Sequence, residues 1–515
     1  MKRTIKIHPN DNVAVALVPL SANETIEFED ESVVLKEDIK QGHKFSLKPI
    51  QKDENVIKYG DPIGHATKDI EEGCHVHVHN VKTNLSDMLE YSYRPQLAEM
   101  KKDAHRTFMG YLRKNGEAGI RNEIWIIPTV GCVNSVVKKV EAKAQHLVGG
   151  SVEAVVAFNH PYGCSQMGDD QDNTRQVLAD LIVHPNAGGV VVLGLGCENS
   201  NIAEVKKHLP ENYDTERNRF IVAQEHEDEI EECLKHVNEL AELMKNDKRE
   251  EISAEKLVIG MKCGGSDGLS GITANPTVGR FSDLLIACGG TTILTEVPEM
   301  FGAETLLMNR CENTELFDKT VHLINDFKQY FMNHNQTIYE NPSPGNKEGG
   351  ITTLEDKSLG CTQKSGAANV QGVLAYAERV TVPGLNLLSA PGNDLVASTA
   401  LAASGCQMVL FTTGRGTPFA TAVPTLKIAS NTALYEKKKK WIDFNAGRAV
   451  EDLSIDECGE ELFQLVLDTA SGKKAKSEED GYHDIAIFKQ GVTLFVKLLL
   501  KNESKQEVVY KFTTI

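Results

Sequence analysis

Hydrophobic positions between Glu123 and Asp267 recur as short runs rich in Val and Ile, and a loop of small residues with one cysteine follows each run. Continuous apolar runs are typical of strands that are buried on both faces of a parallel sheet. The segments between the runs, such as Ser135–Leu147, have helical spacing. The pattern predicts that all four cysteines leave the carboxyl edge of one sheet, where open α/β sheets bind ligands. The runs are Ile124–Val130, Val152–Phe158, Gly189–Leu195 and Leu257–Gly260, and their cysteines are Cys132, Cys164, Cys197 and Cys263.

Residues 1–90 contain short strand-like runs separated by turn residues, which predicts a small β domain. The last run would place His75, His77 and His79 on one face, because side chains alternate along a strand. Three imidazoles on one face could bind a metal or a carboxylate, or could form the polar face of a half-buried strand. Before them, Gly42-His43-Lys44 presents a His–Lys pair after a tight turn.

The rest of the chain divides into three further parts. Residues 91–106 carry mixed charge with Tyr and Pro, which indicates a linker, and a second α/β domain is expected over residues 107–250. A C-terminal α/β domain is expected over residues 251–515, after the charged stretch Lys245–Glu255. The tail beyond Gly491 suggests a hairpin. The predicted fold class is therefore multidomain α/β, with a small β domain ahead of parallel-sheet domains.

Composition narrows the function further. The chain has 515 residues and a formal net charge of −18, which argues against nucleic acid as a partner. The N-terminus has no apolar segment typical of a signal peptide, and no run reaches the ~18–20 apolar residues of a membrane span. Eleven cysteines fit reduced thiols and metal ligands better than a disulfide framework. We therefore expect a cytoplasmic protein.

The glycine-rich loops do not match nucleotide-binding motifs. Gly194–Asn199 follows a strand but lacks the third glycine of a dinucleotide fingerprint, and Gly345-Asn346-Lys347 lacks the upstream glycine of a phosphate loop. Neither NAD nor ATP is predicted.

The cysteine loops are more informative. Thiolates select zinc, iron or iron–sulfur clusters, and converging loops can supply them without local Cys-x-x-Cys spacing. Cys132, Cys164 and Cys197 are the predicted ligands, with His160 and Cys263 as further candidates. The alternative is that these cysteines pack as small residues at strand ends.

Three cations lie in loops bordered by glycine, namely Lys262, Lys347 and Arg415. Arg suits bidentate binding of a carboxylate, and Lys provides a point charge or, with a depressed pKa, a base. Ordinary surface cations beside turns are the alternative for each of them.

With these loops the sequence resembles the altronate/galactarate dehydratase family of sugar-acid hydro-lyases. The resemblance extends from about His8 to about Leu494. The stretches that carry it include Gly42-His43-Lys44, Lys58-Tyr59-Gly60, Asn159–Cys164, Gly194–Glu198, Cys263–Asp267, Thr273–Pro276, Asn341–Lys347, Thr412–Pro418 and Asp443–Gly447.

The resemblance implies an N-terminal β-clip domain of SAF type, a second domain often involved in dimerisation, and a Rossmann-like C-terminal region, hence a homodimer. It also implies dehydration of D-altronate to 2-keto-3-deoxy-D-gluconate in bacterial hexuronate (galacturonate) breakdown. A dependence on ferrous iron is implied as well, with manganese or an iron–sulfur cluster as alternatives. Trp125–Asn134 and His75–Asn80 look like the altronate-using members more than the galactarate-using ones.

For such a reaction, iron on the three cysteines would activate the leaving hydroxyl, and His43 or Lys44 would move protons. Lys262, Lys347 and Arg415 would clamp the substrate carboxylate. Galactarate or another aldonic or aldaric acid is the alternative substrate. A sugar-acid sensor without catalytic activity is the alternative from another class of protein.

Overall fold

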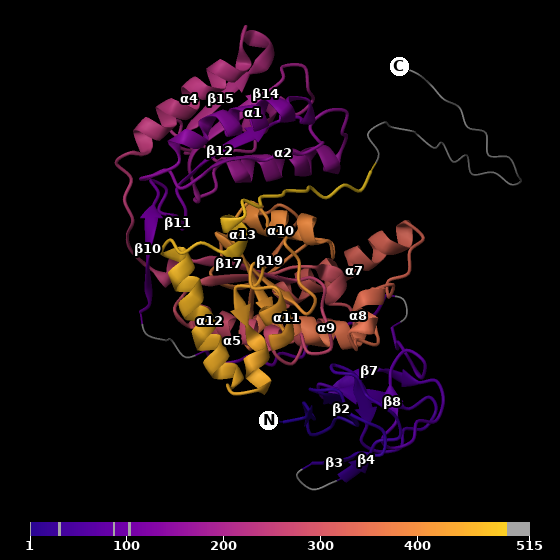
Figure 1. Cartoon of the computed structure of the whole chain (residues 1–515). Coiled ribbons are helices and arrows are strands. Elements are labelled where there is room, and N and C mark those ends of the chain that lie inside the picture. Colours follow the sequence, from indigo (N-terminus) through magenta and orange to yellow (C-terminus); the bar gives the residue numbers. More distant parts are fainter. Residues whose placement is uncertain (1, 29–31, 86–87, 101–104, 492–515) are drawn as a thin grey trace, which may run out of the picture.

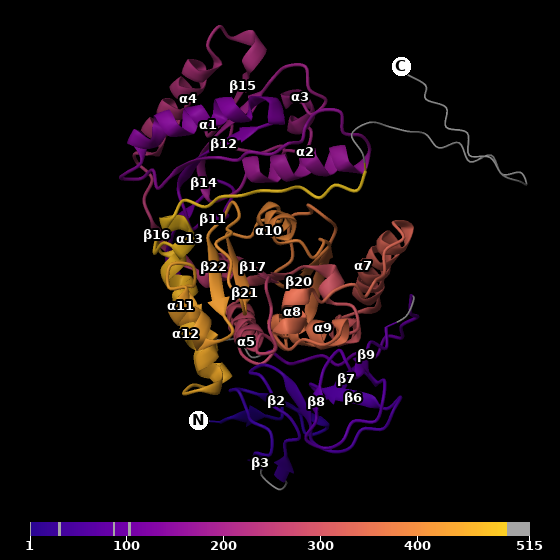
Figure 2. The ribbon, with the colours of Figure 1, turned by 45° about the vertical axis from the view of Figure 1, so that its right-hand side comes forward.

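The computed structural model of the chain describes residues 2–28, 32–85, 88–100 and 105–491 (Figure 1). A central C-terminal domain carries a small N-terminal domain at one end and a second domain at the other (Figures 1 and 2). The multidomain α/β class expected from the sequence is confirmed. Within the described residues, no helix combines the length and the apolar character that crossing a membrane requires.

The N-terminal domain consists of short antiparallel strands. One sheet has the order β1-β2-β5-β8, a second pairs β3 with β4, and a third has the order β6-β7-β9. Its core is aliphatic, with Val13, Ile50, Val56 and Ile63 all buried. The strands are β1 Thr4–Ile5, β2 Val13–Ala16, β3 Thr25–Glu27, β4 Ser32–Val34, β5 Lys44–Ser46, β6 Asn55–Lys58, β7 Asp61–Ala66, β8 His75–Val76 and β9 Val81–Lys82.

The histidine-rich run is a shorter strand than its alternation predicts. Strand β8 ends at Val76, and a turn follows, in which the side chain of Asn80 accepts a hydrogen bond from the His77 N–H while the Asn80 N–H donates to the His77 carbonyl. Local bonding by Asn competes with the sheet ladder here.

The second domain is a four-stranded parallel sheet of order β13-β12-β14-β15 with helices on both faces. Helices α1 and α4 cover one face, and α2 covers the face toward the C-terminal domain (Figures 1 and 2). The strands are β12 Glu123–Pro128, β13 Val155–Ala157, β14 Ala187–Gly194 and β15 Asn218–Val222, and the helices are α1 Asn134–Ala144, α2 Asp169–Ile182, α3 Ile202–Lys206 and α4 Glu229–Met244.

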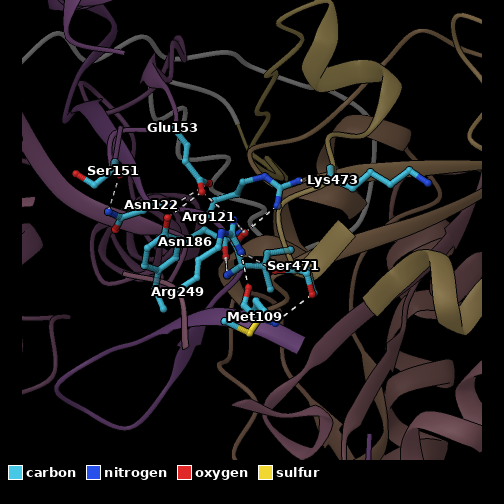
Figure 3. A network of polar contacts seen from close by, with 12 residues as sticks. Met109, Arg121, Asn122, Ser151, Glu153, Asn186, Arg249, Ser471 and Lys473 are labelled. Carbon is cyan, nitrogen blue, oxygen red and sulfur yellow. Dashed lines mark hydrogen bonds and ion pairs between the residues drawn. The ribbon is translucent and has the colours of Figure 1, made fainter. Parts of the chain in front are cut away.

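The chain enters and leaves the second domain through a small antiparallel sheet of order β11-β10-β16. A polar network ties this sheet to the C-terminal domain (Figure 3). Arg249 donates to Glu153 at 2.8 Å and to the carbonyl of Ala470, and Arg121 donates to the carbonyls of Thr469 and Lys473. The carbonyls of Thr469 and Ala470 lie at the end of helix α12 (Ile455–Ala470), so the arginines satisfy helix-terminal acceptors. The strands are β10 Thr107–Leu112, β11 Ala118–Gly119 and β16 Glu250–Ser253.

The C-terminal domain is a seven-stranded sheet of order β19-β20-β18-β17-β21-β22-β23, in which all pairs are parallel. Its strands are β17 Val258–Cys263, β18 Thr291–Leu294, β19 Val370–Leu374, β20 Gly384–Leu388, β21 Met408–Thr413, β22 Thr425–Ala429 and β23 Phe444–Asn445. Its helices are α5 Ala274–Ala287, α6 Glu304–Met308, α7 Thr314–Asn333, α8 Pro344–Glu348, α9 Leu354–Thr362, α10 Asp394–Ala403, α11 Thr432–Lys437, α12 Ile455–Ala470 and α13 Lys476–Glu479.

Helices α5 and α12 pack on one face of this sheet, and α10 lies on the other face against α2 of the second domain. The extended residues 482–491 run between the two domains, with Ile485 and Ile487 buried in their shared core. The linker residues 88–100 lie along the C-terminal domain, where the Tyr93 hydroxyl donates to the Cys311 carbonyl. The hairpin expected from Leu494–Leu500 and Glu507–Phe512 lies outside the described residues.

One expectation about the sheets is wrong. Cys132, Cys164 and Cys197 follow strands of the second domain, whereas Cys263 ends β17 of the C-terminal sheet. The chain passes through β16 before it starts β17, and β16 pairs with β10 instead of extending the first sheet. The four cysteines therefore leave two different sheets.

Candidate functional site

The N-terminal domain docks on the C-terminal domain through the loop between α8 and α9. The ring Nε2 of His43 lies 3.0 Å from the carbonyl oxygen of Glu348, and the Lys44 ammonium donates to the carbonyl of Gly350 at 2.7 Å. The loop after β17 joins this contact, because the Gly268 N–H donates to the Gly349 carbonyl. Two residues proposed for proton transfer thus meet the carboxyl edge of the C-terminal sheet.

A buried charge cluster holds this contact together. Asp356 of α9 accepts from Lys44 at 2.8 Å and from Lys58 at 2.9 Å. Burial alone would raise the pKa of Asp356, but the charges of the two lysines outweigh it and hold that pKa well below its usual range. One carboxylate cannot compensate both ammonium groups equally. Burial therefore prevails at Lys44, whose pKa falls to about 8, whereas the pairing with Asp356 raises the pKa of Lys58.

Four histidines of the N-terminal domain gather beside this cluster. The His43 Nδ1 and His75 Nε2 lie 2.9 Å apart, and the His77 Nδ1 lies 3.2 Å from the Thr352 hydroxyl. The rings of His77 and His79 lie 5.5 and 5.3 Å from the His75 ring, which confirms that the three predicted histidines are neighbours. Burial lowers the pKa of His75 to about 4 and that of His77 to about 3, with the charge of Lys44 acting in the same direction. Their imidazoles are therefore neutral at pH 7, with lone pairs for a proton or a metal.

Two of the three predicted carboxylate-binding cations lie at the same place. Arg415 donates to the carbonyl of Gly345 and forms an ion pair with Glu348 at 3.1 Å, which attaches its loop to α8. Lys347 belongs to α8 itself, which begins with a capping box between Ser343 and Asn346. The structure thus brings His43, Lys347 and Arg415 around one short helix.

Lys262 lies deeper than its glycine-rich surroundings suggest. It is the penultimate residue of β17 and fully buried, and its ammonium pairs with Glu296 at 3.0 Å and with Asp394 at 2.6 Å. Two carboxylates already compensate its charge, so it is positioned to hold the sheet edge rather than to reach outward.

A buried thiol–carboxylate cluster adjoins Lys262. Cys263 and Cys361 contact each other at 3.5 Å, and both thiols donate to one carboxylate oxygen of Glu299, at 2.8 and 3.2 Å. The contact between the two sulfurs lowers the pKa of Cys263, and the same contact raises that of Cys361. Sequence reasoning missed Glu299 and Cys361, because nothing in their spacing links them to Cys263.

The three predicted metal ligands of the second domain lie exposed on neighbouring loops. The loops are bonded to one another: the Gly131 N–H donates to the Tyr162 carbonyl at 2.9 Å and the Ser200 N–H to the Gly163 carbonyl at 3.0 Å. However, the thiol sulfurs of Cys132, Cys164 and Cys197 do not all lie within 4.8 Å of one another. In the described part of the chain only Cys263, Glu299 and Cys361 meet that distance.

His160 is not placed for metal binding. Its Nδ1 accepts from the Tyr162 N–H at 3.2 Å and its Nε2 donates to the Pro128 carbonyl at 2.7 Å, so both ring nitrogens are occupied. The ring is fully buried and holds the Cys164 loop against β12.

A family model matches each of the three domains. Family models described as "Altronate/galactarate dehydratase SAF domain", "D-galactarate dehydratase/Altronate hydrolase, second domain" and "D-galactarate/Altronate dehydratase, C-terminal" match residues 2–84, 110–245 and 254–493.

Full-length relatives agree with these matches. An altronate dehydratase of Bacillus subtilis (strain 168) is 55% identical over 96% of this chain and 100% of its own. An altronate dehydratase of Escherichia coli (strain K12) is 53% identical over 95% and 99% of the two chains. The chain belongs to the altronate/galactarate dehydratase family. A more distant member of this family, the galactarate dehydratase (L-threo-forming) of Escherichia coli (strain K12), is 34% identical over 94% of this chain and 96% of its own.

Two cavities lie at the boundaries between the domains. A small cavity of about 10 Å³ lies where the SAF domain meets the C-terminal domain, and Tyr59, Asp267, Lys357 and Cys361 belong to its lining. It has room for about one water molecule. A much larger cavity of about 1340 Å³ lies between the second and C-terminal domains. None of the five residues predicted for catalysis belongs to the lining of either cavity.

Proposed function

We propose that the chain is a hydro-lyase that dehydrates D-altronate to 2-keto-3-deoxy-D-gluconate in hexuronate breakdown. The choice of D-altronate as the substrate rests on the relatives. The altronate dehydratases are 53–55% identical to this chain, whereas the galactarate dehydratase is 34% identical. Ferrous iron, a homodimer and a cytoplasmic location remain predictions from the sequence.

The reaction requires two aids. A base takes the C2 proton, the electron pair of the C2–H bond forms the C2–C3 double bond, and the C3 hydroxyl takes up a proton and leaves as water. The enol then tautomerises to the 2-keto acid. The C2–H is weakly acidic, because the adjacent carboxylate must accept further negative charge. The reaction therefore needs a base whose pKa lies near the working pH and a group that compensates the negative charge on the carboxylate.

The histidine cluster supports proton transfer. Burial lowers the pKa of His43 and of its neighbours His75 and His77, so that their imidazoles are neutral at pH 7, which is the form in which a ring nitrogen can act as a base. Lys44 is held by Asp356 and the Gly350 carbonyl. We therefore assign proton transfer to His43 and the placement of the domain to Lys44.

Arg415 and Lys347 support carboxylate binding. The Arg415–Glu348 pair is exposed, and such pairs contribute about 0–1 kcal/mol, so a substrate carboxylate can replace Glu348 as the partner. The cavity between the SAF and C-terminal domains measures about 10 Å³ and has no room for a six-carbon acid, so binding there requires the SAF domain to move away from the C-terminal domain.

A bound ferrous ion would supply Lewis acidity for the leaving hydroxyl. Three thiolates on one tetrahedral ion lie about 3.8 Å apart, given a metal–sulfur distance of about 2.3 Å. Cys132, Cys164 and Cys197 do not all lie within 4.8 Å of one another, so they do not fit a single ion as they stand, and an iron–sulfur cluster stays the alternative predicted from the sequence.

Keto-acid formation from D-altronate and from galactarate tests the function, with protein purified without oxygen and assayed with and without Fe(II). We expect iron-dependent turnover of D-altronate. Turnover of galactarate alone would correct the substrate, and turnover of neither acid together with ligand-induced stabilisation would favour the sensor alternative.

A matched pair of variants tests the site. His43→Asn should lower kcat about 10²-fold or more, as expected for loss of an acid–base group. His146→Asn, on the exposed surface of the second domain, should leave kcat unchanged. Equal rates for both variants would remove His43 from the mechanism.

A further inference from the structure

Cys263, Glu299 and Cys361 come from three elements at the carboxyl edge of the C-terminal sheet. Cys263 ends β17, Glu299 lies in the 3-10 turn Val297–Glu299 after β18, and Cys361 is on α9. At most 6% of each residue is exposed. We infer that these three residues form a binding site for a divalent cation of the zinc or iron(II) class.

The distances fit a site of this kind. Tetrahedral coordination with metal–sulfur bonds of about 2.3 Å and metal–oxygen bonds of about 2.1 Å separates two sulfurs by about 3.8 Å and a sulfur from an oxygen by about 3.5 Å. The two sulfurs lie 3.5 Å apart, and the Glu299 oxygen lies 2.8 and 3.2 Å from them. Outward movements of well under 1 Å would therefore admit the ion.

The charges around the cluster are compatible with a dication that is bound by two anionic thiolates. Three buried lysines, Lys262, Lys357 and Lys364, surround three acidic side chains, those of Glu296, Glu299 and Asp394. Burial and the charge of Glu299 raise the pKa of Glu296 well above its usual value, so the lysines carry at least as much charge as the acidic side chains. A dication with the two thiolates adds no net charge to this set. An apolar environment accepts a neutral complex and penalises an isolated ion.

The residues around the cluster orient its ligands. Lys357 donates to the other oxygen of Glu299 at 2.7 Å, which turns the free oxygen toward both sulfurs. Glu296 accepts from the Cys263 N–H at 2.9 Å. Glu296 itself adopts a left-handed backbone conformation with a φ of 70°, which costs free energy for a residue other than glycine. Hydrogen bonds of this kind to ligating carboxylates tune metal sites.

Three protein ligands would leave a fourth position of a tetrahedral ion to another group. Catalytic metal sites commonly have three protein ligands and leave a fourth position to water or substrate. Cys361 and Lys357 belong to the lining of the small cavity beneath the SAF domain, which has room for about one water molecule. The inference deepens the proposed function by placing the cation next to the docking surface of that domain. The ligand geometry supports it without reference to turnover.

Cobalt binding to the full-length reduced protein tests the site. Apoprotein prepared without oxygen is titrated with Co(II), and the sulfur-to-cobalt charge-transfer band in the near ultraviolet reports thiolate ligands. We expect the band in the unchanged protein, about half of its intensity in Cys361→Ser, and binding weakened about 10- to 100-fold in Glu299→Gln.

Two controls separate this site from other thiols. Cys406→Ser removes a fully buried cysteine of the same domain and should leave the band intact. The triple variant Cys132→Ser/Cys164→Ser/Cys197→Ser should also retain it. An unchanged band in Cys361→Ser, no band in the unchanged protein, or loss of the band in the triple variant alone would overturn the inference.

Measuring the Tm with and without Zn(II) tests the site in variants whose fold is less stable. Zn(II) should raise the Tm of the unchanged protein and of Cys406→Ser, and should raise that of Glu299→Gln, which retains the size of the side chain, by clearly less. An equal rise in Glu299→Gln would count against the site. Because neither readout requires substrate, failure to turn over any sugar acid would refute the proposed function and leave this result in place.

Discussion

Lys44 of β5 and Asp356 of α9 form an ion pair of 2.8 Å in which both side chains are fully buried, although 312 residues separate them in the chain. Lys58 shares the same carboxylate. The docking of the SAF domain on the C-terminal domain therefore depends on one acidic group that serves two cations.

Asp356→Asn should destabilise the docked arrangement by about 3–5 kcal/mol, because two buried ammonium groups lose their counter-charge. Urea unfolding of the full chain measures this change. Glu231→Gln breaks an exposed pair with Lys143 and should cost at most about 1 kcal/mol. Similar losses in both variants would show that the buried cluster does not hold the domains together.

Gly271→Ala should force the SAF domain away from α9. A Cβ at this position would lie 2.2 Å from the Tyr59 hydroxyl and 2.7 Å from the Gly360 Cα, so Tyr59 must move. We expect a cost of about 1–3 kcal/mol and reduced keto-acid formation. Gly392→Ala is the control, because a Cβ there meets nothing within 4 Å. Normal activity in Gly271→Ala would argue against a role for this contact.

Acid should weaken the fold before it protonates most carboxylates. The pKa values of His75 and His77 are about 4 and about 3 in the folded chain, against about 6.5 in an unfolded one. Between these values the unfolded state binds more protons, so stability falls as the pH falls below about 6.5 and levels off below the folded values. Asp356 acts in the same direction only below its unfolded pKa of about 4.

Urea midpoints at several pH values between 7 and 4 check this dependence. His77→Gln should flatten the profile, and His146→Gln, which is exposed, should not. A profile for His77→Gln that matches the unchanged protein would assign the acid sensitivity to other groups.

Arg121→Ala should loosen the second domain. Arg121 pairs with Glu478 at 2.6 Å and donates to the Lys473 carbonyl, in the network of Figure 3. Its removal leaves these acceptors unpaired at a buried place, at a cost of about 3–5 kcal/mol in thermal unfolding. Arg448→Ala removes a largely exposed arginine that pairs with Asp452 and Glu461, and should cost at most about 1 kcal/mol. Equal changes in Tm would contradict this assignment.

Local hydrophobic patterns were sufficient to predict helices and strands of the second domain. The predicted helix Ser135–Leu147 is α1 Asn134–Ala144 followed by the 3-10 turn Gln145–Leu147, and the predicted strand Gly189–Leu195 is β14 Ala187–Gly194. In the helix the apolar positions that face the core repeat with the helical period, and the strand is a continuous apolar run because both of its faces are buried, so the sequence contains both signals.

The site could not be predicted to the same extent, because its residues meet only in three dimensions. Cys263 and Cys361 are 98 residues apart, and no periodicity connects them. Lys58 and Lys364 are buried, yet a hydrophobic pattern treats lysine as a surface residue. A buried cation depends on a partner that the pattern does not identify, and the same holds for Asp356.

The linker between the SAF domain and the second domain affects how fast the SAF domain docks again after it has moved away. Residues 88–100 lie along the C-terminal domain, with Tyr93 and Gln96 bonded to the carbonyls of Cys311 and Asn309. This attachment leaves little free chain between the anchored linker and the docking surface, so the SAF domain is kept at a high effective concentration there. Re-docking after each opening is therefore a unimolecular step whose rate does not depend on how much protein is present, whereas a chain cut within the linker would have to reassemble its site by collision.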